Sequence, residues 1–210
     1  MATFTRTDID GLERFFRTNL INSLTGFKSV ALIGTVSEKG QENLAIFSQI
    51  IHVGANPPLI GILFRPDKVE RHTLENLRST QAFTINHIRP EFVQQAHHTA
   101  ARWEASEFAA CDLTAEYKDE FPAPFVGEAQ VKIGLKPVEE QQLINETILV
   151  VGEIQRLYVP DSHLGDDGFV DLESARSITC SGLDSYHTTQ KIVRLSYAKP
   201  NQPLKEVNRN

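Results

Sequence analysis

Cysteine is scarce in this sequence, which contains only Cys111 and Cys180 among its 210 residues. The two cysteines form no CxxC pair and show no zinc-type spacing, so a zinc ribbon and a disulfide framework are both disfavoured. We expect two separate reduced thiols, buried or half-buried.

Long apolar runs and an excess of basic residues are missing as well. No uninterrupted stretch approaches the roughly 20 apolar residues of a membrane-spanning helix, and residues 1–8 lack the apolar run of a signal peptide. The net charge of −6 disfavours binding to a nucleic-acid backbone, because such proteins usually carry a basic face. We therefore expect a cytoplasmic protein that binds neither membranes nor nucleic acids. A local basic pocket for one phosphate is compatible with this charge.

Common catalytic and nucleotide-binding motifs are also absent. There is no GxGxxG after a predicted strand and no GxxxxGK[ST], GxSxG or HExxH, so the usual signals of Rossmann, P-loop, hydrolase and metalloprotease sites are missing. His97 and His98 are adjacent and would not face each other on a helix, which makes them a poor chelating pair. Asp166, Asp167 and Asp171 lack EF-hand spacing and predict a tight acidic turn. We expect no metal site.

The composition that remains is that of one globular domain. Hydrophobic residues make up 40% of the chain and charged residues 23%, which is ordinary for a globular protein. Barrels and sandwiches of this length often form a single domain. We expect one domain over residues 1–210, with a helix near the N-terminus and a loose tail after about residue 200.

Hydrophobic periodicity predicts more strands than helices. Thr7 and Asp10 resemble a capping box and precede apolar residues at helical spacing. Helices are expected at residues 8–23, 67–78 and, irregularly, 89–107. Strands are expected at residues 27–36, 43–53, 59–64, 81–88, 129–138 and 147–159, and loops at 112–124 and 161–168. Short turns join most neighbours, which favours an antiparallel, barrel-like sheet with flanking helices over a doubly wound parallel sheet.

The strand from Asn43 combines small, polar and aromatic residues. Alternation puts Asn43, Ala45 and Phe47 on one face and places Ser48 on the other. A small residue between an amide and an aromatic ring would let a planar heterocycle approach the backbone, whose polar groups could bind its rim. An ordinary half-buried strand has the same composition, so this pattern alone leaves both interpretations open.

Arg71, His72 and Thr73 fall in the first turns of the helix expected at residues 67–78. An anion at that place would gain free N–H groups and the positive end of the helix dipole. The alternative is a solvated helix face on which Arg71 pairs with Glu75. Arg65, at the end of the preceding strand, either joins the anion site or lies on the surface.

Several segments in this order resemble the flavin reductase-like family of FMN-binding split barrels, which includes flavoredoxin-like proteins. The matching residues are Asn43, Ala45 and Ser48; the Asn56-Pro57-Pro58 turn; Arg71, Thr73, Asn76 and Leu77; and Phe83 with Asn86. Residues 151–154 and 182–187 resemble the closing strand and the C-terminal motif of the family. The resemblance covers roughly residues 27–197.

The resemblance implies a mainly β fold, an antiparallel split β-barrel of Greek-key type with flanking helices, that binds FMN in a homodimer. Position by position, it implies that Asn43, Ala45, Phe47 and Ser48 line the flavin and its ribityl chain. It also implies that Arg71 and Thr73 hold the phosphate, helped by His72, with Asn86 nearby. Arg65 is a further candidate for the cofactor site, from its place at the end of the preceding strand. Tyr186 and His187 would contact the substrate nicotinamide, and His187 is the one candidate catalytic residue.

The implied activity is that of a flavin reductase. Such an enzyme takes hydride from NADH or NADPH and passes electrons through FMN to free flavin, a metal chelate, oxygen or a protein. An FMN-binding electron carrier without its own NAD(P)H oxidation is the first alternative, and a barrel without flavin is the second. The residues do not distinguish NADH from NADPH.

Overall fold

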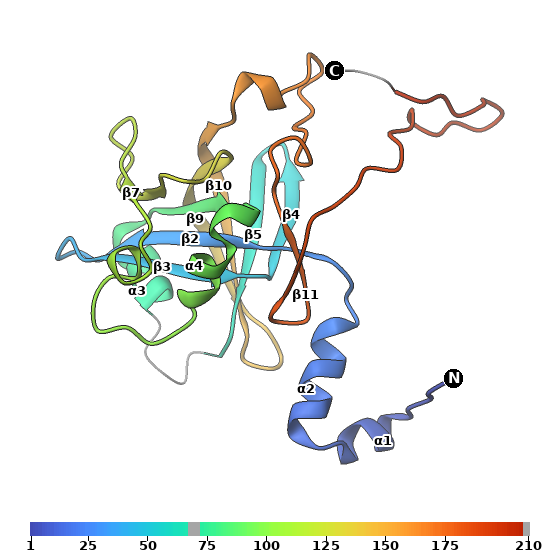
Figure 1. Ribbon diagram of the computed structural model, residues 1–210, viewed down its shortest axis with the longest axis horizontal. Coiled ribbons are helices and arrows are strands. Elements are labelled where there is room, and N and C mark those ends of the chain that lie inside the picture. Colours follow the sequence, from blue (N-terminus) through green and yellow to red (C-terminus); the bar gives the residue numbers. More distant parts are fainter. Residues whose placement is uncertain (67–71, 208–210) are drawn as a thin grey trace.

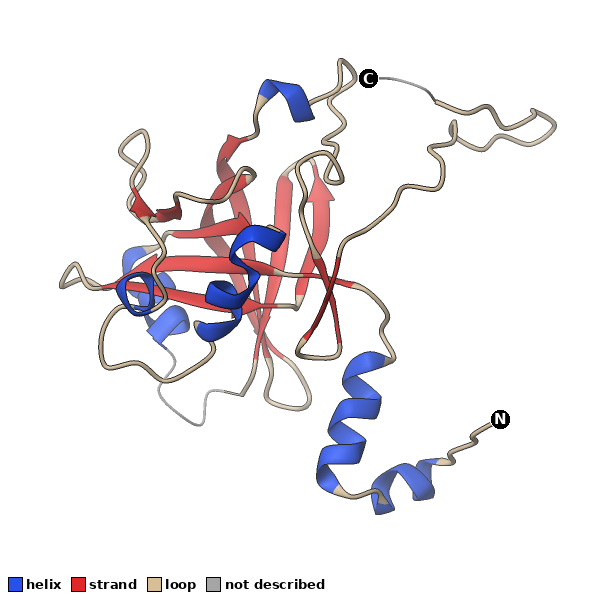
Figure 2. Ribbon diagram, in the orientation of Figure 1, coloured by secondary structure: helices blue, strands red, loops and turns tan. Residues whose placement is uncertain are grey.

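The computed structural model describes residues 1–66 and 72–207. A seven-stranded antiparallel sheet forms its centre, in the order β3-β2-β6-β9-β10-β5-β4 (Figures 1 and 2). Its strands are β2 (Ala31–Val36), β3 (Glu42–Phe47), β4 (Ile50–Ala55), β5 (Pro58–Phe64), β6 (Phe83–His87), β9 (Lys132–Gln142) and β10 (Ile148–Tyr158). Every neighbouring pair is antiparallel, which confirms the mainly β prediction.

The two edge strands of this sheet are consecutive in the chain. β3 ends at Phe47 and β4 begins at Ile50, so Ser48 and Gln49 alone connect opposite edges. The sheet must therefore curl until its edges meet at this corner, and the backbone N–H of Leu63 donates to Gln49 O at 3.0 Å there. The prediction of one strand over residues 43–53 is wrong, because the chain changes edges in the middle of it.

Tight packing of the curled sheet depends on Gly34 of β2. A Cβ atom at this position would lie 2.2 Å from the Pro124 carbonyl oxygen and 2.6 Å from Thr84 Oγ1. Apolar clusters fill both sides of β2, with Leu32 in one cluster and Ile33 in the other. Successive residues of the central strands are therefore buried alike, as is typical of a sheet covered on both faces.

The N-terminal helix is divided into α1 (Arg6–Gly11) and α2 (Arg14–Ser23), which project away from the sheet (Figure 1). The capping box uses Thr5 and Asp8 and not the predicted Thr7 and Asp10, since the same spacing occurs two residues earlier. Leu12 is extended, and the Glu13 carboxylate then accepts from the backbone N–H groups of the next turn. This second cap explains why the predicted single helix is interrupted.

The irregular helix predicted over residues 89–107 is three short pieces. They are the 3-10 turn η1 (Pro90–Phe92), α4 (Val93–His98) and α5 (Glu107–Ala110). Thr99 Oγ1 donates to Ala96 O at 2.8 Å, and Trp103 Nε1 donates to His98 O at 3.1 Å. These side chains satisfy carbonyl groups at the end of α4, and residues 99–106 then form a loop.

Small additional strands complete the fold. β1 (Lys28–Ser29), β11 (Thr179–Ser181) and β12 (Ser185–His187) form a three-stranded sheet. β7 (Ala115–Glu116), inside the predicted loop of residues 112–124, pairs with β8 (Phe125–Val126), which follows that loop. η2 (Asp161–His163) is a 3-10 turn in the segment predicted as a turn. Residues 188–207 form a long arm with one isolated bridge, Leu195 to Glu206. Within residues 1–66 and 72–207, no helix combines the length and apolar character needed to cross a bilayer.

Candidate functional site

A pocket of about 900 Å³ lies where the edges of the curled sheet meet. The β3–β4 corner lines one side with Ala45, Phe47 and Ser48, and α3 (His72–Thr80) contributes His72 and Thr73. Ala45 and Thr73 therefore share one cleft within a single chain, as the sequence predicts. This volume falls in the upper part of the usual range for small-molecule sites, about 300–1,000 Å³.

A buried polar cluster joins the strand side of the pocket to the helix side. Asn43 Nδ2 donates to Thr73 Oγ1 at 3.0 Å and to Thr35 Oγ1 at 3.1 Å. Asn76 Nδ2 donates to the same Thr35 oxygen at 3.2 Å. All four side chains are buried, so the hydrogen bonds fix the start of α3 against β2 and β3.

The cluster leaves Thr73 able to bind an anion. Its hydroxyl oxygen accepts from Asn43 and lines the pocket, and a hydroxyl has one proton to donate besides the bonds it accepts. His72 lies one residue earlier on the same pocket wall. Arg71, the third member of the predicted anion site, lies outside the described residues.

The described pocket lining carries more positive than negative charge. Arg65 and Arg102 both line it, and within residues 1–66 and 72–207 neither side chain forms an ion pair or hydrogen bond. Glu107 is the one acidic residue in this lining. The site is therefore cationic in a chain of net charge −6, which supports recognition of an anionic ligand.

The Glu107 side chain hydrogen-bonds to the edge of β3 that pairs with no other described strand. Its carboxylate accepts from the backbone N–H of Leu44 at 3.0 Å, across the edge that no other described strand pairs with. Because N–H groups of a strand alternate in direction, the N–H of Ile46 points to the same edge, and Ile46 lines the pocket. Unpaired backbone groups beside Ala45 can therefore hydrogen-bond to a flat ligand.

Asn86 does not reach the pocket. Its side chain is fully buried, where Nδ2 donates to Leu32 O and to Thr84 Oγ1, and Oδ1 accepts from the backbone N–H of Val126. The predicted placement of Asn86 near the ligand is thus corrected, because these bonds hold it inside the sheet. It supports β2 and β6 and is not among the described residues that line the pocket.

Tyr186 and His187 also lie outside the pocket lining of the chain. Tyr186 Oη lies 2.6 Å from His97 Nδ1, and burial raises the pKa of Tyr186 to about 12. His187 Nε2 lies 2.8 Å from Ser181 Oγ, and its ring contacts Phe27 edge-on. Only Leu183, at the turn between β11 and β12, extends from this hairpin into the pocket, so the nicotinamide roles of Tyr186 and His187 remain predictions.

Sequence reasoning missed the part of the pocket lining that follows α4. The loop after α4 supplies it through Thr99, Ala100, Ala101, Arg102 and Trp103. Asn22 of α2 and Asn145 and Thr147 of the β9–β10 hairpin also line the pocket. One sequence feature could have indicated this part of the lining: Arg102 stands directly before Trp103, the single tryptophan of the chain.

The other candidate metal residues serve local roles. His97 contacts Tyr186, whereas His98 packs edge-on against Trp103. The Asp171 carboxylate accepts from the backbone N–H groups of Glu173 and Ser174, which lowers its pKa. Among the residues that the structure describes, no group of three or more His, Cys, Asp or Glu side chains could hold a metal ion.

Cys111 and Cys180 are buried free thiols, and burial raises the pKa of each.

Comparisons with known proteins agree with this geometry. Residues 27–173 match the family model described as flavin reductase like domain. A structure from Shewanella frigidimarina NCIMB 400, provisionally described as a flavin reductase with split barrel domain, is 47% identical with a TM-score of 0.91, and the match covers 94% of this chain and 100% of that chain.

More distant structures share the fold. Nitrilotriacetate monooxygenase component B from Bacillus cereus is 21% identical with a TM-score of 0.81, over 93% of this chain and 98% of that chain. Flavoredoxin of Desulfovibrio vulgaris (Miyazaki F) is 23% identical with a TM-score of 0.69, over 84% and 92%. The protein therefore has the split-barrel fold, and it belongs to the flavin reductase-like domain family.

Proposed function

We propose that this protein is an FMN-dependent oxidoreductase of flavin reductase type, which takes hydride from NADH or NADPH and passes electrons to an acceptor such as free flavin or a metal chelate. The family typically binds FMN. The observation that carries the proposal is that Ala45, on the open edge of β3, and the Thr73 side chain line one and the same pocket. These are the two features that a flat ring with a phosphate tail requires.

The residues present fit FMN at both of its ends. Thr73 would donate its hydroxyl proton to the phosphate, while Arg65 and His72 would add charge or further donors on that side. Ala45 leaves space for the ring to approach the backbone edge of β3. Phe47, whose ring centroid lies 5.0 Å from that of Phe64, forms an apolar wall. Ser48 offers a hydroxyl at the corner.

The protein's part in the reaction is to bind, orient and shield the flavin. Redox chemistry would come from the bound flavin, which accepts hydride and releases electrons. Asn43 keeps the Thr73 hydroxyl in place, and Glu107 keeps the edge of β3 in place. No described side chain in the pocket needs to act as a general acid or base for this role.

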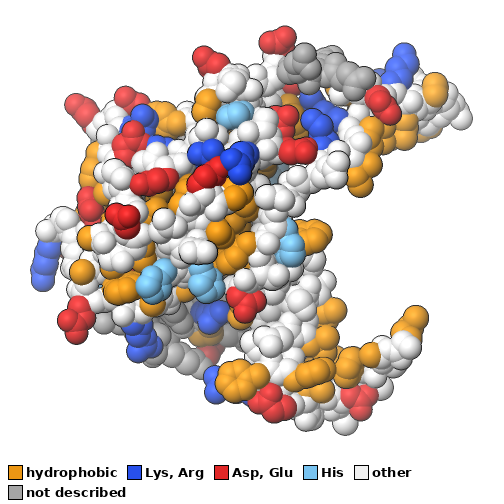
Figure 3. Space-filling model, in the orientation of Figure 1, with side chains coloured by type: hydrophobic (Ala, Val, Ile, Leu, Met, Phe, Trp, Pro, Cys, Tyr) orange, Lys and Arg blue, Asp and Glu red, His pale blue; other side chains and the backbone are white. Residues whose placement is uncertain are grey.

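We further propose that two chains form a homodimer. Large apolar side chains are exposed on α2 and on the C-terminal arm: Phe15 is 71% exposed, Ile192 96% and Tyr197 88%. Figure 3 shows hydrophobic atoms along both projections, with a hollow between them. Exposed apolar surface of this extent is typical of an interaction site, and a second copy of the chain would cover it.

The visible spectrum of the freshly purified protein tests the proposal, followed by release and identification of the chromophore. We expect a yellow protein whose flavin absorbance bleaches within seconds of anaerobic mixing with NADH or NADPH. Bound flavin that does not bleach would instead favour an electron carrier. A colourless protein that fails to take up added FMN would contradict the proposal and favour a barrel without flavin.

A further inference from the structure

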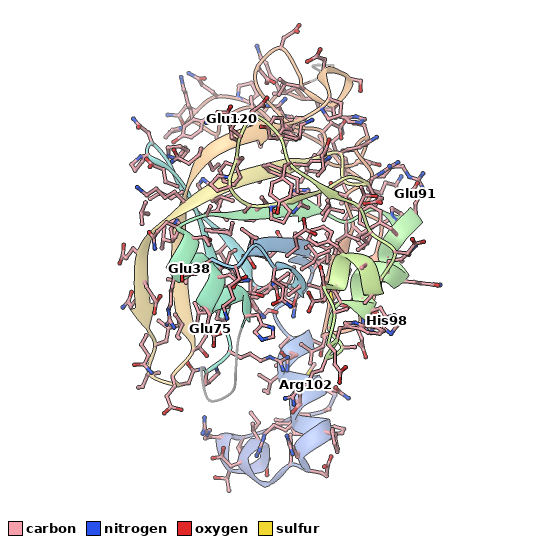
Figure 4. All side chains as sticks on the ribbon, turned by 90° about the vertical axis from the view of Figure 1, so that its left-hand side faces the viewer. Glu38, Glu75, Glu91, His98, Arg102 and Glu120 are labelled. Carbon is pink, nitrogen blue, oxygen red and sulfur yellow. The ribbon has the colours of Figure 1, made fainter. Side chains whose placement is uncertain are left out.

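The loop of residues 99–103 places an arginine and the only tryptophan of the chain next to each other on the pocket wall. Figure 4 labels Glu75 of α3 and, below it, Arg102 of the loop after α4, and residues of both segments line the pocket. Thr73, the proposed hydrogen-bond donor to the FMN phosphate, lies on α3. The 99–103 loop therefore offers a second set of binding groups.

Trp103 is held as a fixed aromatic surface. Its indole Nε1 donates to His98 O at 3.1 Å, and the His98 ring packs edge-on at a centroid distance of 4.8 Å. The half-buried indole also packs against the core cluster that contains Phe108. A ring fixed by these contacts can stack against a nucleobase without losing side-chain freedom on binding.

Arg102 is available to bind an anion. It is exposed at the pocket and makes no ion pair or hydrogen bond with residues 1–66 or 72–207. Elsewhere in the chain arginines pair with carboxylates, as Arg78 does with Glu140 and Arg194 with Asp167. A free guanidinium presents a forked set of donors that suits phosphate oxygens.

FMN has one phosphate, and Thr73 with its neighbours would bind it. A second cationic wall with an adjacent aromatic ring therefore indicates a second anionic ligand, and the pocket of about 900 Å³ is large enough to admit one beside the cofactor. We propose that the 99–103 loop binds the adenosine diphosphate part of the reduced pyridine nucleotide, with adenine against Trp103 and pyrophosphate on Arg102. This inference rests on the proposed function, because it takes NADH or NADPH as the hydride donor.

ADP-ribose is the probe, because it carries adenine, ribose and pyrophosphate but cannot reduce a flavin. Binding to the FMN-loaded protein is measured by calorimetry and by the fluorescence of Trp103. We expect saturable binding with a change in tryptophan fluorescence, and an affinity at least tenfold weaker in Arg102→Ala. Arg156→Ala is the matched control, since Arg156 is an exposed arginine of β10 outside the pocket, and its affinity should stay within twofold.

Variants of the tryptophan separate stacking from loop structure. Trp103→Phe should keep the affinity for ADP-ribose within about threefold, whereas Trp103→Ala should weaken it at least fivefold. Equal affinities in Trp103→Ala and the unchanged protein would overturn the stacking role. FMN affinity, titrated separately in each variant by flavin fluorescence, should change less than threefold.

Failure of this inference is distinguishable from failure of the proposed function. ADP-ribose that does not bind, in a protein that binds FMN and oxidises NADH, overturns the inference alone. Loss of FMN affinity in Arg102→Ala without loss of ADP-ribose affinity also overturns it, since Arg102 would then belong to the cofactor site. A protein that binds no FMN overturns the proposed function.

Discussion

Asn43 on β3 and Thr73 on α3, thirty positions apart in sequence, are joined by a hydrogen bond of 3.0 Å from Asn43 Nδ2 to Thr73 Oγ1. This bond aligns the threonine hydroxyl at the pocket and connects the two walls that we assign to FMN. The consequences of the bond can be measured directly.

Thr73→Val removes the hydroxyl and nearly preserves the shape of the side chain. A hydrogen bond to a charged group contributes about 1.5–3 kcal/mol, so FMN affinity should fall by roughly 10- to 100-fold. Thr80→Val is the control, because Thr80 lies in the last turn of the same helix and bonds to Asn76 O. Equal losses of affinity in both variants, measured by flavin fluorescence titration, would remove Thr73 from the phosphate site.

Ala45→Phe should prevent FMN binding in a protein that still folds. The new ring would occupy the space beside the β3 edge that the flavin requires. Ala55→Phe makes the same change at the exposed end of β4, away from the pocket lining, and should leave the protein yellow. Circular dichroism checks folding of both, and a yellow Ala45→Phe protein would contradict the placement of the ring.

Gly34→Ala should destabilise the sheet. The added Cβ would meet the Pro124 carbonyl oxygen at 2.2 Å, and overpacking of this kind costs about 1–3 kcal/mol or more. Gly11→Ala, at the end of α1, meets no atom within 4 Å and should change the free energy of unfolding little. Urea unfolding of the two variants provides the comparison, and similar midpoints would show that the strand shifts to accept a methyl group.

His87 should make folding less favourable in mild acid. Burial lowers its pKa to about 4 from an ordinary 6.5, and its Nδ1 lies 3.0 Å from Ser177 Oγ. Between pH 6.5 and 4, His87 therefore binds a proton in the unfolded chain but stays neutral in the folded protein. Stability is complete above pH 6.5, falls as the pH decreases toward 4, and loses on the order of 2–3 kcal/mol from this group.

Unfolding curves of the protein and of His87→Gln between pH 7.5 and 4 test this effect. The substitution should flatten the pH dependence, while His52→Gln on the exposed part of β4 should leave it unchanged. An NMR titration of the His87 ring gives an independent value, and a pKa near 6.5 would contradict the prediction.

The C-terminal arm should contribute to the dimer. Ile192→Ser combined with Tyr197→Ser removes two exposed apolar side chains, each of which would contribute about 1.5–3 kcal/mol if fully buried by a partner. The dimer dissociation constant should rise at least tenfold in analytical ultracentrifugation. Tyr117→Ser, an exposed tyrosine beside β7 on the far side of the molecule (Figure 1), serves as the control. A monomer at all concentrations before substitution would refute the dimer.

Local patterns predicted the parts of the site that lie within one element. Alternation along a strand put Asn43, Ala45 and Phe47 on one face, and Phe47 indeed packs in a different core cluster from Leu44. Helical spacing placed Thr73 near the start of α3. Both inferences need only the repeat of a strand or helix, which the sequence carries by itself.

Contacts between residues far apart in the sequence were harder to predict. Asn86 fitted the family pattern, yet three internal hydrogen bonds hold it inside the sheet. Ser48 and Gln49 read as the middle of a strand but form the corner between the two edges. Neither outcome follows from nearby residues, because each depends on what the curled sheet places opposite them.

The sequence by itself determined a mainly β chain, its strand and helix faces and the small and polar residues that suit a flavin with its phosphate. Only the tertiary structure decided which of those residues meet. Curling of the sheet brings the β3–β4 corner to α3, and the loop after α4 brings Arg102 and Trp103 to the same pocket. The physical reason is that backbone repeats act over a few residues, whereas a pocket is formed by packing between segments far apart in the chain.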